Sequence, residues 1–206
     1  LHADRMAFIR SHRQSPLALY VAGEMISKSF SVPATDLEEI LARNCHISDT
    51  ARAARFCRQA EQARYFCKDI HYPDVPLHTP TFDTTLLSAH IRPGHVMLID
   101  CWASWCGPCR AAIPAVKALY DKYDRDRFDV ISISLDSKKE DWQKALEEEK
   151  MPWPQFIAGN RGYEQLTLRY NINSIPNLIL IDDKGQVVCN TFSPEEISIE
   201  LEEILR

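Results

Sequence analysis

The stretch WCGPC, residues 105–109, places Cys106 and Cys109 either side of a Gly-Pro pair. The segment before it, HVMLIDCW (95–102), is a short apolar run that predicts a buried strand. The segment after it, GPCRAAIPAVKALYDKY (107–123), predicts a helix. Two thiols therefore lie where a buried strand turns into a helix. They could be metal ligands, a structural disulfide or a redox pair.

The metal and structural alternatives are disfavoured. A structural zinc site needs four ligands, whereas the chain has one CxxC, and His90 and His95 fit no zinc-finger spacing. A disulfide across two residues closes a very short loop, and stabilisation by a disulfide grows with loop length. The sequence predicts no bound metal and favours a working dithiol.

The redox interpretation accounts for each residue of the motif. Cys106 would lie at the start of the helix, where unpaired backbone N–H groups and the helix dipole stabilise a thiolate. Cys109, one turn later, is placed to resolve a mixed disulfide. Pro108 suits a first helical turn because its missing N–H has no partner there. Gly107 would let a substrate backbone approach.

The chain before this motif is predicted to be helical. Residues 1–75 form an all-helical region, with helices expected over 15–30, 35–43 and 48–70. The segment HYPDVPLHTPTF (71–82) contains three prolines and little periodicity, so it is predicted to be a linker. We interpret the helical region as a packing unit at the end of a larger N-terminal part.

The rest of the chain, residues 76–206, is predicted to be one α/β domain. Strand and helix patterns alternate after the motif and end in a hairpin and a helix, which indicates a mixed sheet between helices. The expected elements are strand 128–136, helices 139–150 and 162–170, hairpin 177–190 and helix 193–206.

Composition narrows the class of protein. The 206 residues carry a net charge of −5 and no basic run, so nucleic acid is not an expected partner. No apolar run approaches the roughly 20 residues of a membrane helix. The first residues, LHADRMAFIR, do not begin with Met and have no apolar signal core, which indicates a chain cut from something longer. Whether the longer chain carried a signal peptide or a lipid anchor is a question that the sequence leaves open.

The segment DCWASWCGPCR (100–110) resembles the active site of thioredoxins. Asp100, six residues before Cys106, matches the family's buried carboxylate, which assists proton transfer at the resolving cysteine. Pro114, five residues after Cys109, matches the position where the family's helix is kinked.

A second segment extends the resemblance. SIPNLILID (174–182) resembles the segment that carries the family's cis-proline. The resemblance implies that Ile175 and Pro176 lie opposite the cysteines and expose backbone for a substrate strand. It also implies that Trp105 borders the substrate groove.

The length of the chain between the two segments indicates a branch of the family. Forty residues, Asp136–Ile175, separate the strand from the proline loop, more than in ordinary thioredoxins. An inserted helix and strand there resembles the TlpA/ResA-like thiol-disulfide oxidoreductases of the bacterial envelope. This implies a thioredoxin-like three-layer fold, a periplasmic or envelope location, and lipid anchoring as one option for the full-length protein.

The resemblance implies an enzyme that reduces disulfides of envelope proteins without a cofactor. It also implies that a membrane thiol reductase returns the cysteine pair to the reduced state. An oxidant or isomerase of the same fold is the alternative. A peroxiredoxin is disfavoured because Ile99 and Ala103 occupy the places of its characteristic Pro and Thr. A partner-docking module built on residues 1–75, with redox activity secondary, is the alternative from another class.

Two departures from the family leave questions open. The lysine that pairs with the buried carboxylate is replaced, by rough alignment, with Ser132, so Asp100 could instead be a hydrogen-bonded structural acid. Outside the motif, Cys101 and Cys189 are expected to be apolar filler. The pairing of the remaining cysteines, Cys45, Cys57 and Cys67, is left open.

Overall fold

The computed structural model describes residues 2–12, 15–26, 32–44, 51–64, 67 and 70–206. The chain divides into two compact units, Leu1–Ile70 and His71–Arg206. The second unit begins five residues before the boundary at residue 76 that the sequence indicated. None of the helices described is long and apolar enough to cross a membrane.

The first unit is helical. Its helices are α1 (His2–Ser11), α2 (Pro16–Ile26), α3 (Ala34–Asn44) and α4 (Ala51–Ala63). In α4, Ala53, Phe56, Ala60 and Ala63 recur at helical spacing and are buried in one apolar cluster with residues of α1, α2 and α3. The helix predicted over 48–70 is wrong in length, because α4 ends at Ala63.

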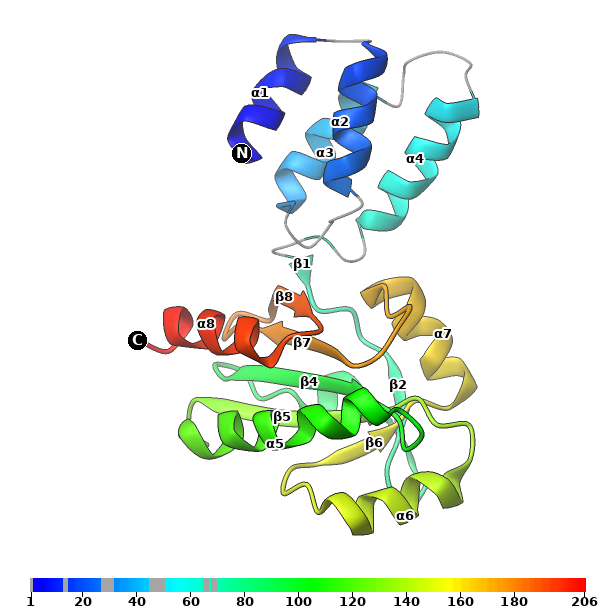
Figure 1. Cartoon of the computed structure of the whole chain (residues 1–206), viewed down its shortest axis with the longest axis vertical. Helices are drawn as coiled ribbons and strands as arrows, with labels where there is room; N and C mark the ends of the chain where they lie inside the picture. The colour runs from blue at the N-terminus through cyan, green and yellow to red at the C-terminus, as the bar shows by residue number, and fades with distance from the viewer. Residues whose placement is uncertain (1, 13–14, 27–31, 45–50, 65–66, 68–69) are drawn as a thin grey trace. The chain divides into compact units, whose positions relative to one another are not determined.

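The second unit is built on an eight-stranded mixed sheet with the order β1-β8-β7-β4-β5-β6-β2-β3, which confirms the predicted fold class (Figure 1). β4 pairs parallel with β5, and β5 pairs parallel with β6, whereas β7 is antiparallel to both β4 and β8. The strands are β1 (Ile70–His71), β2 (Pro76–His78), β3 (Thr84–Leu86), β4 (Val96–Trp102), β5 (Phe128–Ser134), β6 (Gln155–Ile157), β7 (Asn177–Ile181) and β8 (Gln186–Thr191).

Helices cover both faces of this sheet. α5 (Gly107–Lys122) and α8 (Pro194–Ile204) contact each other and lie across one face (Figure 1). The inserted α6 (Lys139–Glu149) joins α5, since Trp142 and Ala145 pack with Cys109 and Ile113. α7 (Gly159–Tyr170) lies on the other face. Asn190 of β8 donates its side-chain N–H to the carbonyl of Tyr170 and is in register, through β7, with Ile99, whose side chain alternates with those of Leu98 and Asp100. A 3₁₀ helix, η2 (Leu87–His90), follows β3.

The predicted linker over 71–82 is wrong. β2 lies in this segment, pairs antiparallel with β3, and meets β6 where His78 pairs with Ile157. Leu77 is fully buried. A short strand with proline at its first position gives no period-2 signal of its own, and its partner β6 lies some 80 residues later.

Gly162 fixes how closely α7 approaches β2. A Cβ there would lie 2.5 Å from the carbonyl oxygen of Pro76 and 3.2 Å from the Cβ of Ala158. We therefore expect Gly162→Ala to lower the free energy of unfolding by about 1–3 kcal/mol, because backbone would have to move.

The control is Gly23 in α2, where the nearest atom to an added Cβ is 4.0 Å away on Phe56. Gly23→Ala should be neutral or stabilising by up to about 1 kcal/mol, since alanine favours helices. Urea unfolding of both variants would compare them. Equal stability of the two would contradict the close approach.

Candidate active site

Cys106 and Cys109 lie at the turn from β4 into α5. Cys106 is the N-cap of α5, and its Sγ accepts a hydrogen bond from the backbone N–H of Cys109 at 3.2 Å. The two residues are joined by a disulfide, with their Cα atoms 5.2 Å apart. Their exposed fractions are 5% and 3%. After reduction, the same N–H group and the helix dipole would stabilise a thiolate on Cys106.

Asp100 is a buried carboxylate on β4. Its Oδ2 accepts a hydrogen bond of 2.8 Å from the hydroxyl of Ser132, which itself accepts one of 2.8 Å from Trp153 Nε1. Burial raises the pKa of Asp100 to about 6, and the hydrogen bond from Ser132 offsets part of this rise. Ser132, the expected replacement for the family's lysine, is the direct partner of Asp100 across β4 and β5.

Asp100 lies on the face of the sheet that carries the cysteines. Leu98 and Trp102 share its face, because side chains alternate along a strand. Leu98 packs in one cluster with Val116 of α5, and Trp102 in another with Cys109. The carboxylate is therefore placed under the first half of α5.

The loop before β7, which contains Ile175 and Pro176 and is called the proline loop, lies close to the cysteines. The Ile175–Pro176 peptide bond is cis. Ile175 is partly buried and packs against the cluster that contains Cys106 and Cys109. Asn177 follows at the start of β7 and pairs with Cys101 of β4.

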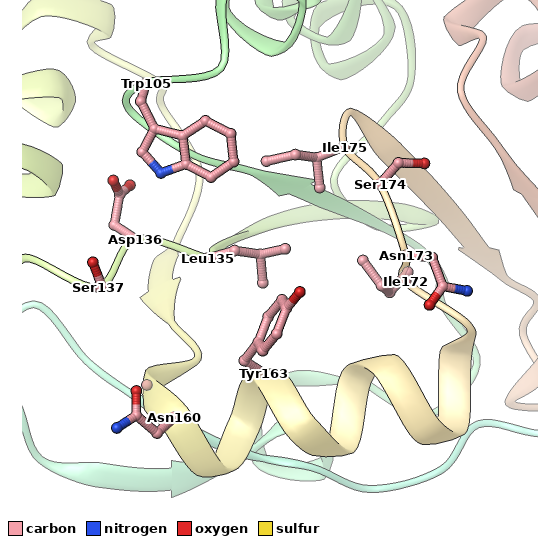
Figure 2. Close-up of a pocket in the computed structure, with 11 residues that line it drawn as sticks. Trp105, Leu135, Asp136, Ser137, Asn160, Tyr163, Ile172, Asn173, Ser174 and Ile175 are labelled. Atoms are coloured by element: carbon pink, nitrogen blue, oxygen red, sulfur yellow. The ribbon is translucent and has the colours of Figure 1, made fainter.

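A pocket of about 500 Å³ reaches Trp105, the residue before Cys106, although neither cysteine lines it. Trp105, 69% exposed, and Ile175 border it together, and Tyr163 of α7 points into it (Figure 2). The other residues that line it are Leu135, Asp136, Ser137, Gly159, Asn160, Ile172, Asn173 and Ser174. Gly107, Pro108 and Pro176 are not among the lining residues.

Comparison with known proteins places this arrangement in a family. A family model described as thioredoxin-like matches residues 94–187. A solved structure described as a thiol:disulfide interchange protein, DsbE, from Chlorobium tepidum is 30% identical. It matches with a TM-score of 0.57 over 68% of this chain and 96% of that one. The chain belongs to the thioredoxin-like thiol-disulfide oxidoreductases.

Curated relatives of the thioredoxin-like unit support this placement. Thiol-disulfide oxidoreductase ResA of Geobacillus kaustophilus is 26% identical over 133 residues, which span 61% of this chain and 75% of that protein. Sporulation thiol-disulfide oxidoreductase A of Bacillus subtilis is 24% identical over 49% of this chain and 61% of its own length. The thioredoxin domain of a Bacteroides vulgatus oxidoreductase shares the fold, with a TM-score of 0.62 at 23% identity.

Sequence reasoning missed most of the wall of the pocket. Leu135, Asp136 and Ser137 follow β5, and Tyr163 and Asn160 belong to α7. The signal available for Asp136 is its place two residues after the end of a parallel strand, at the edge where α/β sheets bind ligands. No local motif marks the residues of α7.

The other cysteines of the thioredoxin-like unit are not at the pocket. Cys101 is fully buried in β4 as a free thiol, and burial raises its pKa, with a further rise from Asp100. Cys189 is half-buried against the core beneath α8. In the helical unit, Cys57 is disulfide-bonded and Cys67 is buried, whereas Cys45 lies outside the described residues.

Proposed function

We propose that this chain reduces disulfides of other proteins through Cys106 and Cys109. The observation that carries the proposal is the position of the disulfide. It lies at the N-terminus of α5, beside Ile175 and a pocket large enough for a substrate side chain. A disulfide held only for stability would not need such an opening.

The exchange proceeds in two steps from the reduced protein. The Cys106 thiolate attacks one sulfur of the substrate disulfide, forms a mixed disulfide and releases the other substrate sulfur as a thiolate. Cys109 then loses its proton and attacks the Cys106 sulfur, so that the second substrate thiolate leaves. Two electrons have passed to the substrate, and the Cys106–Cys109 disulfide remains.

Asp100 is the proposed acceptor of the Cys109 proton. It lies on the same face of the sheet as the cysteines, and its pKa of about 6 lets it be ionised at neutral pH. A carboxylate with a pKa close to the working pH is an effective general base. Trp105 and Ile175 are proposed to form the rim that the substrate chain crosses.

The proposed setting is the cell envelope, where a membrane thiol reductase would return the pair to the dithiol. The disulfide at Cys57, outside the active site, supports an oxidising location because such bonds are rare in reducing compartments. The curated relatives named ResA are called thiol-disulfide oxidoreductases, which supports a disulfide as the substrate. The helical unit, residues 1–70, is a proposed docking element for a partner.

The test is the reduction potential of the Cys106–Cys109 pair in the full chain. Equilibration with dithiothreitol, followed by mass mapping of the two cysteines, separates this pair from Cys57. We expect a value near or below the roughly −270 mV of thioredoxin, since the Gly-Pro pair between the cysteines resembles that of reducing thioredoxins. A value near the roughly −120 mV of a strong oxidant would instead make the protein a disulfide donor.

A further inference from the structure

The carboxylate of Asp136, two residues after the end of β5, accepts three hydrogen bonds. Its Oδ2 accepts from the backbone N–H of Ser104 at 2.8 Å and from the hydroxyl of Ser134 at 2.6 Å. Its Oδ1 accepts from the hydroxyl of Ser104 at 2.6 Å. Asp136 is only 4% exposed. Three donors therefore share one buried acceptor group, and a donor that lost its acceptor there would stay unpaired away from water.

These bonds tie two separate segments together at the active site. Ser104 is the second residue before Cys106, in the turn between β4 and α5. The neighbouring Leu135 donates its backbone N–H to the carbonyl of Trp102 at 2.8 Å. The turn that carries the cysteines is therefore bonded to the segment after β5 at two points, at Trp102 and at Ser104.

The same segment forms a wall of the pocket. Leu135 and Asp136 line it together with Trp105, and Figure 2 shows the carboxylate of Asp136 pointing toward the Trp105 side. Trp105 is mostly exposed, so few packing contacts hold its side chain in place. Its position is therefore set mainly by the backbone of the turn. The position of the pocket wall relative to Cys106 thus depends on the bonds between Asp136 and Ser104.

We propose that Asp136 is a positioning residue that aligns the pocket with the reactive disulfide. The inference rests on the proposed function. It applies to substrates whose chain reaches from the bond under attack into the pocket, and much less to a small disulfide that meets only Cys106. Asp136 makes no contact with the reacting sulfurs in this account, and it acts through Ser104.

The test compares two disulfides in the reduced full chain. Insulin supplies a peptide disulfide with flanking side chains, and hydroxyethyl disulfide supplies a bond without them. For Asp136→Asn we expect KM for insulin to rise about tenfold, since misplacement by a fraction of an ångström weakens oriented binding. The kcat/KM for hydroxyethyl disulfide should fall by no more than about twofold.

Asp74→Asn is the matched control. Asp74 accepts hydrogen bonds from the backbone N–H and the hydroxyl of Ser88, at 2.9 and 2.7 Å, and is not a lining residue of the pocket. Asp74→Asn alters the same kind of carboxylate hydrogen bond away from the pocket. The kinetics with insulin and with hydroxyethyl disulfide should therefore stay as in the wild type. Ser104→Ala, which keeps the backbone bond to Asp136, should raise KM for insulin less than Asp136→Asn does. Ser104→Ala also tests the proposal if Asp136→Asn fails to fold.

The outcomes separate the two proposals. Equal losses on both disulfides, or no change on either, would overturn the positioning role and leave the proposed function standing. A shift in insulin KM with Asp74→Asn as large as with Asp136→Asn would overturn it as well. A wild-type chain that reduces neither disulfide would refute the proposed function itself.

Discussion

Replacing Cys106 with serine is expected to abolish disulfide reduction, with a loss of at least about 10³-fold, because a serine hydroxyl neither ionises at neutral pH nor forms a disulfide. Replacing Cys109 with serine should act differently. The Cys106 thiolate would still attack, but no resolving thiol would follow, so the mixed disulfide with the substrate should accumulate. This asymmetry follows from the place of Cys106 as the N-cap of α5.

Non-reducing gels of each variant mixed with an oxidised protein substrate would measure the difference. Cys109→Ser should give a band of the summed mass that dithiothreitol removes, and Cys106→Ser should give none. Cys101→Ala is the control, because that thiol is fully buried in β4 and its pKa is raised, so its loss should leave turnover intact. Trapping through Cys109 in the Cys106→Ser protein would contradict the assigned order of attack.

The same variants address the docking alternative. If the helical unit binds a partner independently of redox chemistry, Cys106→Ser should bind that partner as the wild type does. Substrates captured only by Cys109→Ser would instead be bound through exchange. The two kinds of partner are therefore distinguishable without knowing either in advance.

The part of the fold nearest the cysteines is encoded locally and was predictable. The seven residues of β4 are all buried and, apart from Asp100, apolar, which marks a buried strand, and Cys106 begins a helix whose Pro108 suits the first turn. The positions of Asp100 and Ile175 were also expected, but only through the resemblance to thioredoxins. Spacing alone does not place residue 175 beside residue 106.

The parts that escaped prediction depend on contacts between distant segments. β2 and β3 have three residues each, and their register is set by partners in the sheet and not by their own pattern. The pocket combines the turn after β4, the segment after β5, α7 and the proline loop. Tyr163 and Asp136 become neighbours of Trp105 only once the sheet order is known.

Asp100→Asn is expected to stabilise the folded protein at pH 7. Burial raises the pKa of Asp100 from 3.8 to about 6, so the folded state binds this proton more tightly than the unfolded state does. Stability contributed by the proton is complete below pH 3.8 and is lost as the pH rises through about 6. The amide of the Asp100→Asn variant does not ionise, so the variant does not lose this stability. The difference in the free energy of unfolding should reach about 3 kcal/mol, because each unit of pKa shift corresponds to about 1.36 kcal/mol.

Urea unfolding of the oxidised wild type and Asp100→Asn between pH 4 and 8 would measure the effect. The two curves should meet near pH 4 and separate as the pH rises. Asp129→Asn is the control of opposite sign, because Asp129 lies on β5 in a 2.6 Å ion pair with Arg92, and its loss should cost stability or leave it unchanged. A constant difference between wild type and Asp100→Asn across this range would mean that Asp100 does not titrate there.

Asp100→Asn should at the same time slow the exchange reaction, which separates a catalytic role from a structural one. Without the carboxylate, release of substrate by Cys109 at pH 7 loses its proton acceptor, and we expect that step to slow by about 10²-fold. Attack by Cys106 should change little, so mixed disulfide should accumulate transiently. A variant that is more stable and equally fast would show that the buried acid is only a hydrogen-bonded partner of Ser132. A variant that is more stable and slower would show that the fold retains an unfavourable charge because the second step of the exchange needs it.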